Sequence, residues 1–583
     1  MPPLQTSVDI TAGNRVFDSL YDSSLPSSQR NCPSWWRQVI QRADSAPDEI
    51  EPGLLSETLH EAGVSVRARG GASCTFSSPS QEAAAAASPP KKLSGTPGSN
   101  APGQGLSGTP RQNAPLKRFE VSEAPAAALS SLAENLKGND LTIVIPRPTG
   151  KTGEPIPIGI AGPGFDGNLT SDTTRTNGYV SSTDVAPTII EFFRAAVPDR
   201  RAVVPAQMIG QAIRSEGSVD PTAIESRGAR MAVVSHRRGP VIGFSLLAWV
   251  LALVLAVVLS RGALAPVGVR LLGLSVVYLP LLLLAGAALK PAEYPEMLLV
   301  MLAAPALAAL TLAALRDYRA LAVAAALTVG AYALDAILGS PLSALSLLGP
   351  NPALGVRFYG IGNELEALLA VLIVGGIGAG LAGFAPRLSP GRCAAAFLAI
   401  GLVFTAIFAS GKFGADVGAA IDFPAGVACA AVAITGGRRR WIVLVVLIPL
   451  IVLALLALAD LVTGANSHFT RSVLDAGGLH SLGDTAQRRL EQTAHSFVRP
   501  ILAVVLPAVV ILAVVAWLRR ATLAGWVRDV PAMRAALIGA AVATIVATLV
   551  NDSGALLLEI AAAYLLVFVG WAWAEGGRSP RVA

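Results

Sequence analysis

The stretch GNELEALLAVLIVGGIGAGLAGF, residues 362–384, indicates the class of fold. After its first turn it carries no charge, and it is long enough to cross the ~30 Å hydrocarbon core of a bilayer as a helix. Gly378, Gly380 and Gly383 fit the pattern GxGxxG, but no strand precedes them, so close packing of helices explains them better than a dinucleotide site. The stretch therefore predicts a buried membrane helix.

Similar apolar runs lie on both sides of this stretch. They predict eleven membrane spans in all, near residues 240–260, 268–289, 295–315, 319–339, 362–384, 392–410, 415–436, 441–463, 500–518, 532–550 and 553–574. The composition agrees: residues AVILMFWYC make up 52% of the 583 residues and DEKR only 14%, against ~25% charged residues in soluble domains. We expect an all-α, multi-pass membrane bundle of about eleven transmembrane helices, with the lipid bilayer as its first partner.

The basic residues indicate orientation and exclude one class of partner. The net charge is +6, but the basic residues lie mainly at the ends of apolar runs, where they orient helices, so no nucleic-acid partner is expected. One set of loops holds fifteen of them and the opposite set nine, with Arg237 and Arg238 in the smaller set. This bias predicts a plasma-membrane protein whose C-terminus is cytoplasmic and whose residues 1–238 are extracytoplasmic. Arginine provides 38 of the 45 basic residues, which suggests a bacterial protein.

The N-terminal part divides by composition. We predict a partial α/β region at 1–75, a low-complexity linker at 76–116, an α/β extracytoplasmic region at 117–238 and the membrane domain at 239–583. The expected elements are a helix leading into a strand over 54–67, helices over 125–136 and 184–196, the latter capped by Asp184, and strands over 141–145 and 156–161. Cys32 and Cys74 could pair if this part is extracytoplasmic. Because 1–22 lacks the apolar core of a signal peptide, we expect the chain to begin inside a longer protein.

The segment GIAGPGFDGNLTSDTTRTNGYVSSTDVAPTIIEFF, residues 159–193, resembles the C-terminal part of alkaline-phosphatase-superfamily domains. The resemblance rests on Thr170, Ser171, Thr173, Thr174, Arg175, Gly178, Tyr179, Val180, Thr183, Asp184, Val185, Ala186, Pro187 and Thr188. It covers about 50–75 and 125–215 and implies an α/β fold. That superfamily holds two metal ions on Asp and His ligands beside a Ser or Thr nucleophile.

This sequence departs from the superfamily at the positions of its metal-ligating residues. After the strand at 141–145 the superfamily has an Asp-His pair, whereas Pro146, Arg147 and Pro148 follow here, and no histidine lies between His60 and His236. We therefore expect a degenerate, incomplete phosphatase-like domain with no metal site and no assigned catalytic residue. A divalent metal is expected only if the domain is completed upstream.

The membrane domain holds a cluster of polar and charged residues that suggests a binding site. Ionisable residues inside a membrane are costly, and each suggests a function. Several lie at the outer ends of spans, next to glycines, where irregular backbone favours binding sites. The candidates for substrate binding are Arg357, Asn363, Glu364, Lys412, Asp416 and Asp552. Lys412 is the expected counter-charge of Glu364 and Asp416. The alternative for each is a charge that reaches the interface or pairs locally.

Three functions fit these features. The first is an envelope protein that handles a phosphorylated or lipid-linked substrate at the outer face, with Arg357 and Lys412 neutralising phosphate and the phosphatase-like domain non-catalytic. The second is a hydrolase or phospho-group transferase whose catalytic residues lie upstream. The third is a structural subunit without a site. Whether the protein is an enzyme stays open.

Overall fold

The computed structural model describes two compact units. Unit 1 comprises 1–152 and 156–220, and unit 2 comprises 153–155 and 221–583. The residues that the structure describes are 3–14, 32–44, 50–51, 53–69, 74–76, 118–147, 155–196, 203–205, 207–350, 352, 358–437, 442–463, 497, 500–551 and 553–576.

Unit 1 is a small mixed region of short helices and strands. In chain order its elements are α1 (Pro3–Ala12), α2 (Cys32–Asp44), α3 (Leu54–Glu61), β1 (Ser65–Ala68), β2 (Arg118–Val121), η3 (Ala126–Ala128), α5 (Leu129–Glu134), β3 (Thr142–Val144), β4 (Gly159–Ala161), β5 (Asn168–Thr170), η4 (Ser182–Asp184), α6 (Val185–Ala196) and β6 (Arg214–Glu216). β1 pairs in parallel with β2, while β3 with β4 and β5 with β6 are antiparallel pairs. The described strands thus form three two-stranded sheets.

The local predictions for unit 1 hold in most cases. The helix-to-strand unit is α3 and β1, and the strands predicted over 141–145 and 156–161 are the paired β3 and β4. The cap of the helix over 184–196 is different. Ser181 occupies the N-cap, and Asp184 accepts from the backbone N–H of Ser181 as the third residue of a capping box. Asp184 was the wrong cap because a carboxylate at the third helical position can reach back to the N-cap as well.

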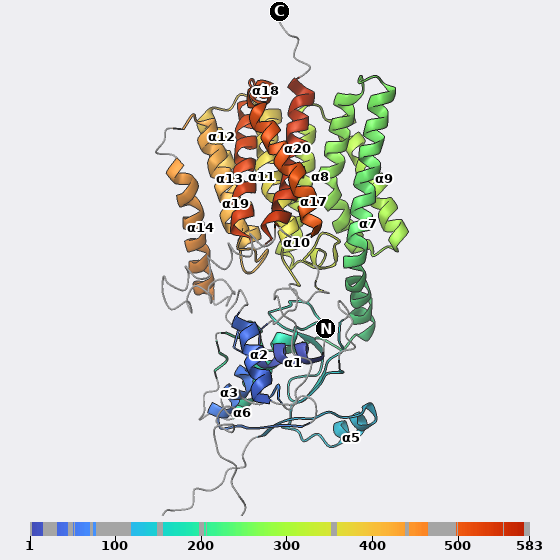
Figure 1. Cartoon of the computed structure of the whole chain (residues 1–583), viewed down its shortest axis with the longest axis vertical. Coiled ribbons are helices and arrows are strands. Elements are labelled where there is room, and N and C mark those ends of the chain that lie inside the picture. The colour runs from blue at the N-terminus through green and yellow to red at the C-terminus, as the bar shows by residue number, and fades with distance from the viewer. Residues whose placement is uncertain are drawn as a thin grey trace, which may run out of the picture. The chain divides into compact units, whose positions relative to one another are not determined.

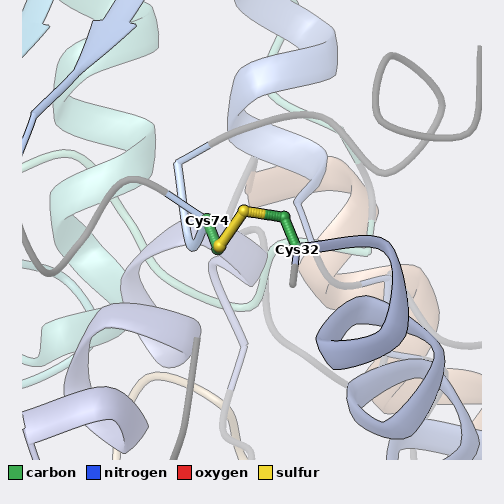
Figure 2. Close-up of a disulfide and its surroundings, with 2 residues drawn as sticks. All are labelled: Cys32 and Cys74. Atoms are coloured by element: carbon green, nitrogen blue, oxygen red, sulfur yellow. A yellow bond between two sulfur atoms is a disulfide. The ribbon is translucent and has the colours of Figure 1, made fainter. Parts of the chain in front are cut away.

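A disulfide joins Cys32, at the start of α2, to Cys74 (Figure 2). Beside it a small core forms around the buried Trp35 and Trp36 of α2 and the buried Val8 of α1. The disulfide therefore ties the segment around Cys74 to α2 within unit 1, as the sequence allowed.

Unit 2 is a helical bundle (Figure 1). Its helices are α7 (Pro221–Leu259), α8 (Ala265–Leu289), α9 (Glu293–Ala314), α10 (Tyr318–Ile337), α11 (Asn363–Phe384), α12 (Pro390–Ala409), α13 (Ala419–Ile434), α14 (Ile442–Thr463), α17 (Pro500–Leu518), α18 (Arg520–Trp526), α19 (Pro531–Val550) and α20 (Gly554–Gly576), with the short turn η5 (Ser343–Leu345) between α10 and α11.

The span count differs from the expected eleven. Each of the eleven apolar runs contains a helix, but within the described residues eight helices are long and apolar enough to cross a membrane. A ninth counts if α17 and α18, which bend by 76° at their junction, form one span. α13 and the described apolar stretch of α14, Val443–Leu456, are shorter than this test requires. The described residues thus support eight or nine of the eleven expected spans.

The apolar stretch 362–384 forms the centre of the bundle. α11 packs against α10, α13, α19 and α20 (Figure 1). Small residues permit this, because a Cβ at Gly378 would overlap Ala536 of α19, and one at Gly375 would overlap Phe568 of α20. The close packing predicted for the GxGxxG glycines is confirmed at Gly378.

Candidate functional site

Two glycine-containing loops of unit 2, one before α11 and one before α13, contact each other. The backbone N–H of Ile361 donates to the carbonyl of Gly414 at 3.1 Å. Gly360 has a φ of +76°, and a Cβ there would overlap that same carbonyl. Only glycine fits this approach, because the left-handed backbone and the contact both exclude a side chain. The contact places the start of α11 beside the loop that leads into α13.

Three carboxylates are buried where these segments meet. Glu366 in the first turn of α11 and Asp422 in the first turn of α13 are 0% exposed, and Asp416 is 3% exposed. A Cβ at Gly418 would overlap the carboxylate of Glu366, so Glu366 lies directly on the backbone before α13. Three acidic side chains from two segments thus share one buried location, which we call the carboxylate cluster.

Hydrogen bonds fix two members of the carboxylate cluster. The side-chain amide of Asn551, after α19, donates to Oε2 of Glu366 at 2.8 Å. Oδ1 of Asp416 accepts from the backbone N–H of Ala419 at 3.1 Å. Neither carboxylate oxygen of Asp422 has a well-aligned hydrogen-bond donor, and its side-chain contact is the Glu366 carboxyl. Since buried polar atoms are nearly always hydrogen-bonded, Asp422 is the exceptional member.

Arg238 of α7 is the ion-pair partner of Glu364. Its Nη1 lies 2.7 Å from Oε1 of Glu364, and the rest of the guanidinium donates to the carbonyls of Leu347 and Gly349 at 2.6 Å each. From the sequence, Arg238 has a role only in orientation and Lys412 is the expected counter-charge of Glu364. The pairing was unpredictable because 126 residues separate the two partners.

A second ion-pair group lies where α7 meets the first turn of α9. Arg230 donates to both carboxylate oxygens of Glu296, at 2.8 and 2.5 Å, and Arg237 lies 3.2 Å from Oε2 of the same carboxylate. Arg230 also donates to the carbonyl of Leu345. The side chains of Arg230 and Glu296 are 3% and 0% exposed. Sequence reasoning missed both residues, although an acid in the first turn of an apolar helix was a signal.

The remaining candidates are placed differently. Lys412 is exposed, and its Nζ lies 5.8 Å from the centre of the Phe413 ring. Asn363 is half-buried and opens α11. Arg357 and Asp552 lie outside the described residues. The structure therefore brings Asn363, Glu364 and Asp416 to the junction of the two loops, with Lys412 on the second loop.

The loop between α10 and α11 is held by a capping carboxylate. Asp335 near the end of α10 accepts from the backbone N–H groups of Leu342 and Ser343, each at 2.9 Å. The Ser340 hydroxyl accepts from the N–H of Gly360 at 2.9 Å. These bonds position the backbone whose carbonyls bind Arg238, so the local structure explains Asp335 without a ligand.

No metal centre is formed by the part of the chain that the structure describes, since no three His, Cys, Asp or Glu side chains there are placed to hold an ion. No protein-family model matches this chain, and neither a curated protein nor a solved structure matches it. The described residues are those of a multi-pass membrane protein with an ion pair and buried carboxylates at the starts of α11 and α13.

Proposed function

We propose that this integral membrane protein binds a phosphorylated or lipid-linked substrate of a bacterial cell envelope and carries it, with the binding site at the junction of the two loops. The observation that carries the proposal is the concentration of charge there. Arg238 and Glu364 form an ion pair beside three buried carboxylates, at the ends of apolar helices. Charges in such a setting are costly and mark substrate pathways.

The residues divide by the part of the substrate they would contact. Lys412 is exposed, and with Arg357 it would neutralise a phosphate. Asn363 would donate to an oxygen of the head group. Arg238 is already bound to Glu364 and two carbonyls, so it supports the start of α11.

The outer face is the side we propose for this site, with unit 1 extracytoplasmic and non-catalytic. The Cys32–Cys74 disulfide supports this orientation, since disulfides persist in oxidising compartments and are rare in the cytosol. Labelling of the native protein in intact cells tests it. A membrane-impermeant thiol reagent should label Cys32 and Cys74 after reduction with an equally impermeant reductant. Labelling only after lysis would contradict the orientation.

Binding is tested on the full chain in nanodiscs by thermal unfolding with phosphatidic acid, phosphatidylcholine or inorganic phosphate as probes. A specific ligand at a hundred times its Kd stabilises the folded state by about 2.7 kcal/mol. We expect stabilisation by phosphatidic acid or inorganic phosphate, and a loss of at least about tenfold in affinity for Lys412→Ala. Arg316→Ala, an exposed arginine in the loop between α9 and α10, is the matched control and should bind normally.

Two results would count against a carrier. If no phosphate-containing probe stabilises the protein, or if Lys412→Ala binds as well as the unaltered chain, the junction is not a phosphate site. Hydrolysis or transfer of a phosphate ester that divalent cations stimulate would favour the phosphatase-superfamily hydrolase or transferase, to which the resemblance of residues 159–193 points.

A further inference from the structure

Asp422 is a fully buried carboxyl group whose side-chain partner is another acid. It is 0% exposed in the first turn of α13, neither of its oxygens has a well-aligned hydrogen-bond donor, and the Glu366 carboxyl lies within hydrogen-bonding reach. An ionised carboxylate in such surroundings bears a desolvation penalty of several kcal/mol. Two carboxyl groups can hydrogen-bond to each other only if one of them carries a proton.

The charged neighbours of Asp422 are themselves acids. Asp416 acts on it through its charge, and the Glu366 side chain lies within hydrogen-bonding reach of it. Like charges in one buried place cannot all ionise, and carboxyl pairs respond by sharing a proton. A proton on Asp422 converts one of its oxygens into a donor, with carboxylate acceptors beside it.

The helices packed around Asp422 carry few other charged groups. α13 contacts α11, α12, α14 and α19. Of these, α12, α14 and α19 carry one each, Arg392, Asp460 and Arg534, and Arg392 and Arg534 lie in the first turns of their helices. From α11 come Glu366 and Glu364, and the latter is paired with Arg238. From the loop before α13 come Asp416 and the exposed Lys412, while Arg357 and Asp552 lie outside the described residues.

We propose that Glu366, Asp416 and Asp422 form a proton-binding site in which Asp422 holds the proton at neutral pH. The step is a simple exchange. A proton enters from water onto an oxygen of Asp422, forming one O–H bond, and leaves the same way, with no redox change. Glu366 and Asp416 accept the hydrogen bond of the acid form. The site rests on the packing of unit 2 alone, so the loss of the carrier function would leave it standing.

Infrared spectroscopy of the full chain in nanodiscs tests the proposal. At pH 7 solvated carboxyl groups are ionised, so an acid C=O stretching band at that pH reports a buried, protonated group. We expect this band in the unaltered protein, its loss in Asp422→Asn, and a shift without loss in Glu366→Gln. Glu559→Gln is the matched control, because Glu559 of α20 also has a buried carboxyl oxygen without a partner. The control should keep the band.

Stability separates a proton from other occupants. Asn mimics the protonated acid, so the Tm of Asp422→Asn should lie within about 1 °C of that of the unaltered chain at pH 7. If Asp422 were instead charged and ion-paired, its replacement by Asn would lower the Tm far more. The proposal is overturned by absence of the acid band at pH 7, by its persistence in Asp422→Asn, or by a large fall in Tm. Stabilisation by Na⁺ that Asp422→Asn abolishes would also overturn it, because the occupant would then be a metal cation.

Discussion

Glu296 holds two arginines of α7, and its replacement by alanine tests how far buried ion pairs support this fold. Arg230 and Glu296 are almost completely buried and bidentate. Removing one partner of a buried pair costs ~3–5 kcal/mol, because the other charge stays buried and uncompensated. Arg237 is 17% exposed, with one contact of 3.2 Å to Glu296 and a hydrogen bond to the carbonyl of Pro291, and such partly exposed pairs contribute about 1 kcal/mol or less. We therefore expect Glu296→Ala to lower the free energy of unfolding by ~3–5 kcal/mol.

The assay is chemical denaturation of the full chain in mixed lipid–detergent micelles, with Arg237→Ala as the matched control. That control should cost about 1 kcal/mol or less. The double variant Arg230→Met/Glu296→Leu should recover most of the loss, since apolar replacement of a whole buried pair is often neutral. The reasoning is refuted if Glu296→Ala costs less than about 1 kcal/mol, or if Arg237→Ala costs as much as Glu296→Ala.

Two further predictions concern a glycine contact in unit 2 and an ion pair in unit 1. Gly360→Ala should destabilise the protein by at least ~1–2 kcal/mol in the same denaturation assay, because its left-handed backbone disfavours a side chain; Gly330→Ala, where a Cβ meets nothing within 4 Å, should be neutral or slightly stabilising, and equal losses would contradict the contact. The bidentate hydrogen bond from Arg214 lowers the pKa of Asp172, so the stabilisation by this pair is present above pH ~4 and is lost as pH falls through the lowered pKa. Both side chains are at least half exposed, so Arg214→Ala should cost about 1 kcal/mol or less at pH 7, and unfolding curves of the two proteins should converge at low pH; a difference that persists there would show that Arg214 acts otherwise.

Local sequence signals predicted much of the candidate site. Glycines beside acids at the starts of apolar runs singled out Glu364 and Asp416, and the structure brings their two loops together through Gly360 and Gly414. The same signals could not identify partners. Lys412 was the nearest cation in the sequence argument, yet Arg238 pairs with Glu364, because the path of α7 past the α10–α11 loop is a property of packing.

By itself the sequence determined that the chain spans a membrane. Runs of about twenty apolar residues leave the backbone no alternative to internal hydrogen bonding in lipid, so helices follow from composition alone. Only the tertiary structure decided which charges neutralise one another. Arg230 and Glu296 meet across 66 residues, and Asp422 is buried beside two other acids. The physical reason is that burial and pairing depend on which helix faces meet, whereas hydropathy depends on one segment at a time.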